Sequence, residues 1–193
     1  MDRRSFIRKA CRAGAGSAFI LAAPGAGSGR AEDLPAVVSA AETAAKAARE
    51  ACERDRKFSR EWILNVVGNL EGKLDEASRT PVLEECGRAC ARKGAVKAAA
   101  AHKGDVDGLL NVLRGWIGEG NARRDGDTVT LVYERCYCPN LSSFEGAVPR
   151  SYCECSRGWV KEMFETAAGR PCDVTLVSSI RRGDKECRFV VRV

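Results

Sequence analysis

Residues 125–139 read Asp-Gly-Asp-Thr-Val-Thr-Leu-Val-Tyr-Glu-Arg-Cys-Tyr-Cys-Pro, and this stretch separates two halves of the chain that differ in character. The triplet Asp125-Gly126-Asp127 is typical of a turn. The β-branched and apolar run from Thr128 to Tyr133 predicts a strand, and Pro139 ends the extended segment that follows it. The chain therefore changes from one kind of secondary structure to another at this turn.

The half before the turn, residues 34–118, has helical periodicity. Apolar residues recur at spacings of three and four from Leu34 to Ala48, which predicts one helix, and a second is predicted over residues 59–76. A third helix opens at Thr80-Pro81 and ends at Gly94, and a fourth runs from Asp105 to Ile117. The second helix carries a stripe that we expect to be core: Phe58, Trp62, Val66, Leu70 and Leu74.

The half after the turn, residues 128–193, begins with the strand, continues through Cys136 and Cys138, and then forms a loop over 139–150. Residues 151–155 predict a short strand or tight loop, and Ser156 is the expected N-cap of a helix through Ala168. Two strands, 174–180 and 188–193, are joined around Gly183. We therefore expect an α+β fold in which N-terminal helices pack on a small antiparallel sheet with a C-terminal β-hairpin.

The N-terminus has the pattern of a twin-arginine export signal. Arg3 and Arg4 are followed by Phe6, and a short apolar stretch then leads to small residues around Ala31. A helix that stays attached is the alternative. We expect residues 1–31 to be removed after export by the twin-arginine machinery. Residues 32–193 then form a single cysteine-rich α+β domain in the periplasm or another extracytoplasmic space, with no membrane span.

The charge of the chain is concentrated in this predicted signal. Without residues 1–31, Lys and Arg fall from 32 to 26 while Asp and Glu fall from 26 to 25, so the formal net charge drops from +6 to +1. The basic surplus therefore gives no argument for nucleic-acid binding.

Four cysteines form a symmetrical pattern, Cys136-x-Cys138 and Cys153-x-Cys155, with fourteen residues between the pairs. Side chains two apart in an extended chain point the same way, so each pair offers two sulfurs from one face. Four thiolates suit tetrahedral zinc or an iron–sulfur cluster. A further pair, Cys86 and Cys90, lies one helical turn apart and could add ligands.

Two other interpretations of the cysteines stay open, namely disulfides and plain buried thiols. An extracytoplasmic protein can form disulfides, for example between the two Cys-x-Cys pairs, or between the further thiols Cys172 and Cys187 across the final hairpin. However, nine cysteines follow residue 31, which is an odd number. The single histidine, His102, lies in a polar stretch and is expected at the surface.

Several of these segments resemble a small, uncharacterised bacterial family related to 4-vinyl reductase and aminothiazoline-carboxylate hydrolase-like domains. The similar segments are residues 86–90 (Cys-Gly-Arg-Ala-Cys), 136–139, 152–159 and 179–189. The resemblance implies an α/β sensor or binding module that holds a small hydrophobic ligand, with cysteines suspected of metal binding.

Three functional hypotheses follow. The first is an exported small-molecule-binding or sensor domain with a metal held by Cys136, Cys138, Cys153 and Cys155, together with Cys86 and Cys90. The second is a hydrolase-like enzyme with a reactive Cys187 or Cys172, where nearby Arg182, Lys185 and Arg188 supply positive charge. The third is a disulfide-stapled structural or partner-binding domain.

Overall fold

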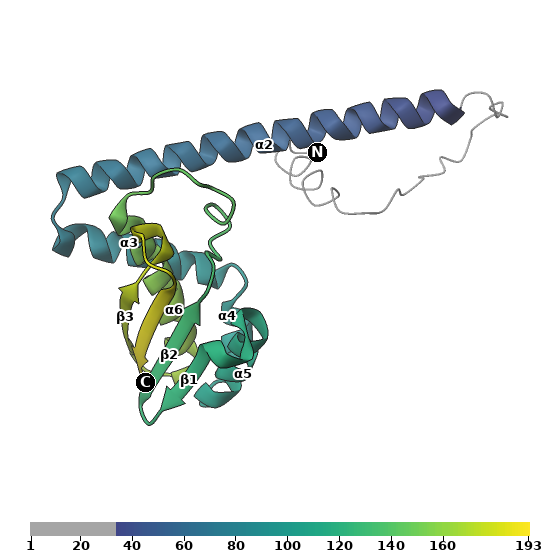
Figure 1. Cartoon of the computed structure of the whole chain (residues 1–193). Coiled ribbons are helices and arrows are strands. Elements are labelled where there is room, and N and C mark those ends of the chain that lie inside the picture. Colours follow the sequence, from purple (N-terminus) through teal and green to yellow (C-terminus); the bar gives the residue numbers. More distant parts are fainter. Residues whose placement is uncertain (1–33) are drawn as a thin grey trace. The chain divides into compact units, whose positions relative to one another are not determined.

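The computed structural model of the protein describes residues 34–193 (Figure 1). The predicted export signal, including Arg3, Arg4 and Phe6, lies outside the described residues. The chain divides into two compact units, residues 1–61 and 62–193. Helix α2 (Leu34–Lys73) begins in the first unit and ends in the second. The sheet and the eight cysteines from Cys86 onward all belong to the second unit.

Helix α2 replaces the two separate helices predicted from the sequence. The residues between the predicted helices contain neither Gly nor Pro and are mostly good helix formers, so nothing interrupts the helix. The predicted core stripe is wrong at Phe58, which is 71% exposed, and at Trp62, which is 61% exposed, whereas Leu70 is partly buried against the core around Val67. Within the second unit the buried side of α2 is rotated by one residue and centres on Val67. No helix in the described part of the chain is long and apolar enough to span a membrane.

The sheet is antiparallel and has four strands in the order β1-β2-β4-β3, which confirms the predicted α+β class. Strands β2 (Thr128–Tyr133), β3 (Asp173–Ser178) and β4 (Cys187–Arg192) match the predicted strands, and β3 pairs with β4 as a hairpin. Strand β1 (Ala122–Asp125) was not predicted. It lies at the edge of the sheet, where its three charged residues are exposed and Ala122 is buried.

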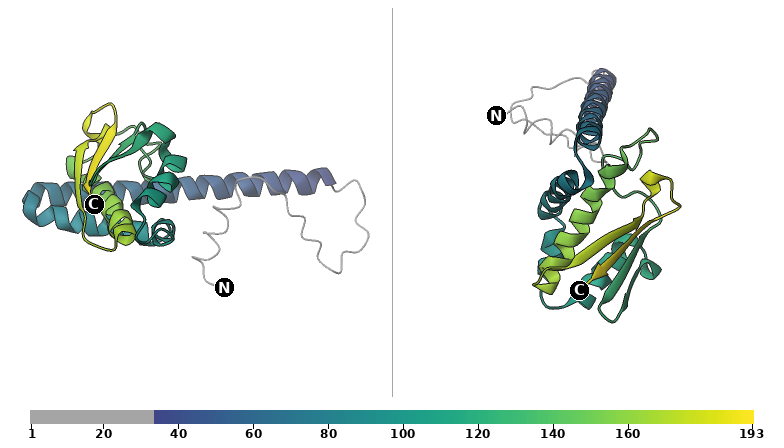
Figure 2. Two further views of the ribbon diagram at one scale, coloured as in Figure 1. Left: turned by 90° about the horizontal axis from the view of Figure 1, so that it is seen from below. Right: turned by 90° about the vertical axis from the view of Figure 1, so that its left-hand side faces the viewer.

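Four helices follow α2: α3 (Glu76–Arg92), α4 (Val96–Ala100), α5 (Val106–Ile117) and α6 (Glu154–Ala168). The short 3-10 helices are η2 (Glu119–Asn121), η3 (Arg150–Cys153) and η4 (Ile180–Arg182). Figure 2 shows α6 running between α3 and the sheet. The main core lies between α5, α6 and the sheet, and its largest buried side chains include Leu113, Phe164 and Phe189. The predicted N-cap Ser156 is wrong, because α6 already begins at Glu154.

Helices α3 and α6 meet at the level of their backbones. A Cβ atom on Gly87 would lie 1.8 Å from the carbonyl oxygen of Cys155, and one on Gly158 would lie 2.0 Å from the carbonyl oxygen of Glu84. Only glycine leaves room for these approaches, because any other residue would place a carbon inside the partner's main chain. Gly87 lies between Cys86 and Cys90, and Gly158 lies three residues after Cys155. Both glycines are therefore needed for the close packing of the two cysteine-containing helices.

Ion pairs join the same two helices on either side of the glycine contact. The Arg88 guanidinium lies 2.8 Å from a carboxylate oxygen of Glu162 and 2.7 Å from one of Glu165. Arg157 on α6 reaches back to Glu84 on α3, with an N–O distance of 2.5 Å. These contacts fix the rotation of α3 against α6, and with it the direction in which Cys86 and Cys90 point.

Substitution of Gly87 by alanine is expected to destabilise the fold, because the new methyl group would overlap the Cys155 carbonyl and force the helices apart. We expect a loss of about 2–3 kcal/mol in the free energy of unfolding, measured by urea denaturation. Gly115→Ala on α5 is the matched control, since nothing lies within 4 Å of its Cβ position. That control should be neutral or stabilising by up to about 1 kcal/mol. Equal stability of Gly87→Ala and the wild type would contradict the close approach.

Candidate functional site

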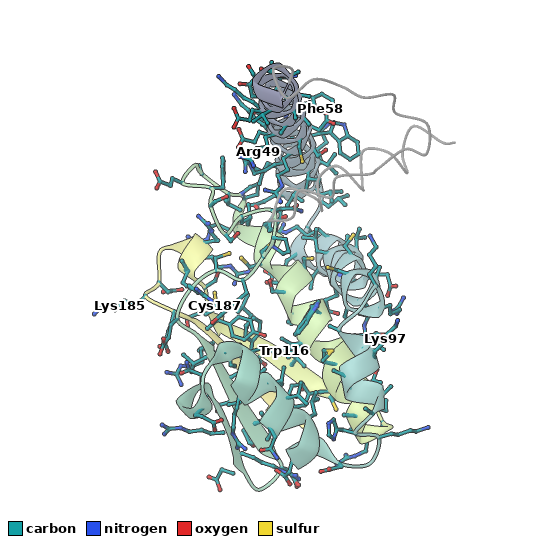
Figure 3. The ribbon with its side chains drawn as sticks, turned by 90° about the vertical axis from the view of Figure 1, so that its right-hand side faces the viewer. Arg49, Phe58, Lys97, Trp116, Lys185 and Cys187 are labelled. Carbon is teal, nitrogen blue, oxygen red and sulfur yellow. The ribbon has the colours of Figure 1, made fainter. Side chains whose placement is uncertain are left out.

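A cavity of about 320 Å³ opens between α5, α6, the sheet and the loop after β2. Its wall is mostly apolar and aromatic, with Trp116 of α5 and Trp159 of α6 6.4 Å apart between ring centroids. Trp116 of α5 and Cys187 of β4, both labelled in Figure 3, line this cavity. Six cysteines line the cavity: Cys90, Cys136, Cys138, Cys153, Cys155 and Cys187.

One set of thiols gathers where α6 meets α3, and we call it the helix-side group: Cys86, Cys90, Cys138 and Cys155. Burial raises the pKa of the Cys155 thiol to about 12, and the neighbouring Cys138, Cys90 and Cys86, with a smaller effect from Cys153, act in the same direction. Cys138 also lies 3.9 Å from the Tyr152 hydroxyl, measured from its sulfur. Cys155 therefore lies near the other three thiols of this group.

A second set lies against the sheet, and we call it the sheet-side trio: Cys136, Cys153 and Cys187. Burial raises the pKa of Cys153, and the nearby Cys187 and Cys136 add to this effect. The fully buried Ser179 hydroxyl donates to the Cys153 sulfur at 3.1 Å, and the Ile180 N–H donates to the Cys187 sulfur at 3.4 Å. Burial also raises the pKa of Cys187, although these donors oppose the shift. Cys153 and Cys187 of this trio are therefore protonated thiols at neutral pH.

The structure divides each predicted Cys-x-Cys pair between the two sets. Cys153 ends η3 and Cys155 lies in the first turn of α6, so this pair is helical and not extended. Residues two apart in a helix point in nearly opposite directions, about 200° around the axis. The expectation that Cys153 and Cys155 present sulfurs on one face is therefore wrong.

The described cysteines from Cys86 to Cys187 are all free thiols. The suggested bond between Cys172 and Cys187 does not fit the hairpin register. Cys172 precedes Asp173, which pairs with Arg192, whereas Cys187 begins β4 at the other end. Five strand residues span about 17 Å, far beyond the Cα separation of roughly 7 Å that a disulfide allows. Cys172 lies outside the cavity, with its sulfur 3.6 Å from the Arg170 carbonyl oxygen.

Among residues 34–193 there is no group of three or more His, Cys, Asp or Glu side chains arranged to hold a metal ion. His102 lies away from the cavity wall, with its Nδ1 atom 3.8 Å from an Asp105 carboxylate oxygen. Six of the thiols therefore line the same cavity, but no three of the described side chains are close enough together to coordinate one metal ion in this arrangement.

The positive charge near Cys187 comes from a different residue than the sequence suggested. Arg182 pairs with Glu154 and Arg188 pairs with Glu186, while Lys185 points outward in Figure 3. The residue that lines the cavity is Arg181. Sequence reasoning missed Arg181, Ser179 and Trp116 as site residues, because a charge in a hairpin turn and an aromatic on a helix have no local signal for a cavity.

The fold and the site define an α+β domain with a thiol-lined apolar cavity. The chain belongs to a family whose model matches residues 36–192 and is described as a family of unknown function (DUF6144). A search of curated proteins found no match. The match includes all the cysteines of both sets.

Alkylation rates should distinguish exposed from cavity thiols. Iodoacetamide reacts with the thiolate, so at neutral pH the exposed Cys86 and Cys90 should react first in chelator-treated protein. Cys153, Cys155 and Cys187 should react more slowly, because burial raises the pKa of each of these thiols and so lowers its thiolate fraction at neutral pH. Their rates should keep rising with pH above 9. Peptide mass spectrometry over a time course gives these rates, and a fast-reacting Cys153 would contradict the assignment.

Proposed function

We propose that this domain is an exported small-molecule-binding or sensor module, which takes a small hydrophobic ligand into its thiol-lined cavity. The observation that carries the proposal is the convergence of six cysteines, from four separate segments of the chain, on one apolar cavity of about 320 Å³. Ligand pockets of this kind have volumes of roughly 300–1,000 Å³ and few polar groups. The cavity therefore has the size and character for a small apolar molecule.

The proposal includes a soft metal, zinc or an iron–sulfur cluster, held by the helix-side group. The donor chemistry fits, because these four residues offer only sulfur and no carboxylate or imidazole side chain lines the cavity. When bound, such a metal supplies a positive charge that stabilises the thiolate forms. Cys155 would hold it from α6, Cys86 and Cys90 from α3, and Cys138 from the loop. The side chains would have to rotate toward a common centre.

Two further considerations support a binding module. The segments that resemble 4-vinyl reductase-type domains include the cysteines of both sets, and that resemblance implies a hydrophobic ligand. Burial raises the pKa of Cys153 and of Cys187 and so favours the protonated thiol. A protonated thiol is a poor nucleophile, so these residues suit the wall of a binding cavity better than a catalytic role.

Metal content of cysteine variants tests the proposal. Anaerobically purified wild-type protein should contain about one equivalent of zinc or one cluster's complement of iron, measured by elemental analysis. Cys155→Ser should lower this content at least about tenfold, because it removes the central sulfur of the helix-side group.

The matched control is Cys172→Ser, which removes a buried thiol outside the cavity and should keep its metal. Only trace zinc and iron in the wild type, or equal loss in both variants, would contradict the metal site. Saturable binding of the neutral fluorescent probe N-phenyl-1-naphthylamine tests the apolar cavity separately.

A hydrolase-like function is the second candidate, and one observation favours it. The Cys187 sulfur accepts from the Ile180 N–H at 3.4 Å and lies beside Ser179 and Arg181, groups that stabilise a thiolate. Fast alkylation of Cys187 at neutral pH, lost in Arg181→Gln, would favour this enzyme over the binding module.

Export by the twin-arginine route is part of the proposal and rests on Arg3, Arg4 and Phe6. Replacement of Arg3 and Arg4 together by lysine should keep the protein in the cytoplasm, because the export machinery reads the arginine pair and not its charge. Immunoblots of periplasmic and cytoplasmic fractions measure this, with Arg8→Lys as the control. Unchanged periplasmic accumulation of the double variant would rule out this signal.

A further inference from the structure

Arg181 differs from every other residue of the cavity wall. It is the only Lys, Arg, His, Asp or Glu among the lining residues, and it extends from η4. Its guanidinium donates to the carbonyl oxygen of Phe144 at 2.6 Å and to that of Leu141. Both acceptors are neutral and belong to the loop after β2, so they hold the side chain in place without balancing its charge.

No carboxylate in the described part of the chain forms an ion pair with Arg181. The two nearest acids in sequence have other partners, because Asp184 accepts from the Ser179 N–H at 2.8 Å and Glu186 pairs with Arg188. By contrast, Arg88, Arg157 and Arg182 each pair with a glutamate. The buried Nε atom of Arg181 also has no hydrogen-bond partner.

A cation beside an apolar cavity is costly unless an anion accompanies it. Cys187 is close to Arg181, but its sulfur already accepts a hydrogen bond from the Ile180 N–H at 3.4 Å. The wall near Arg181 therefore lacks one negative charge and one hydrogen-bond acceptor.

We infer that the ligand of this cavity is an amphiphilic anion, with an aromatic or otherwise flat apolar body and a carboxylate or sulfonate that pairs with Arg181. This inference rests on the proposed binding function and specifies the class of ligand. The apolar body lies between Trp116, Trp159 and Phe189, and the anionic group accepts from the Arg181 Nε–H. The charge-assisted hydrogen bond selects anions over neutral molecules of the same shape.

Two fluorescent probes with the same ring system test the inference on the purified full-length protein. 1-Anilinonaphthalene-8-sulfonate carries a sulfonate, and N-phenyl-1-naphthylamine is its neutral counterpart. The wild type should bind the anionic probe at least about tenfold more tightly, as expected for one charge-assisted contact. Arg181→Gln should remove this preference and leave the Kd of the neutral probe within about twofold.

Arg181→Lys should retain part of the preference, because the charge remains while the planar donor is lost. Arg192→Gln is the control, since it removes an exposed arginine at the far end of β4 and should leave both Kd values unchanged. The neutral probe also reports whether the cavity survives each substitution.

The outcomes separate the two levels of the proposal. Equal wild-type affinity for both probes, or a parallel loss of both in Arg181→Gln and Arg181→Lys, overturns the anionic ligand while the apolar cavity stands. Failure of the wild type to bind either probe overturns the proposed binding function, and this inference with it.

Discussion

The backbone contact between α3 and α6 is the constraint on which the site depends. Gly87 touches the main chain at Cys155, and Gly158 touches the main chain at Glu84. With ordinary side chains at these positions the helices would pack further apart, because the distance between helix axes grows with the size of the residues at the contact. Cys86 and Cys90 would then leave the neighbourhood of Cys155. The glycines of the cysteine-containing segments thus determine which sulfurs become neighbours.

The two sets of thiols have different surroundings and so different chemical capacities. The helix-side group combines the exposed Cys86 and Cys90 with the more buried Cys138 and Cys155, so it connects the surface to the cavity. The sheet-side trio is more enclosed and receives hydrogen bonds from Ser179 and Ile180. A single cavity therefore has a sulfur-rich wall toward α3 and a hydrogen-bonded wall with Arg181 toward the hairpin.

Much of the fold could be predicted from the sequence because its signals are local. The β-branched run 128–133 became β2, Asp105 caps α5 through the Gly108 N–H, and the final hairpin formed as expected. The charged strand β1 and the rotated face of α2 could not be predicted, since pairing and packing partners decide both. The sequence identified which cysteines belong to the candidate site, but it could not predict how their sulfurs are arranged in space. Which sulfur meets which depends on a helix crossing between distant segments, and nothing local distinguishes Arg181 from Arg182.

The distance along the chain between α3 and α6 has a thermodynamic consequence. The helix-side sulfurs become neighbours only when both helices have docked, so an unfolded chain offers no comparable site. Any molecule that binds there binds the folded state alone, and it stabilises that state by RT ln(1 + [L]/Kd), about 2.7 kcal/mol at a hundredfold excess over Kd. Occupancy of the site and the integrity of the fold are therefore linked, and the melting temperature of the domain would report what it has bound.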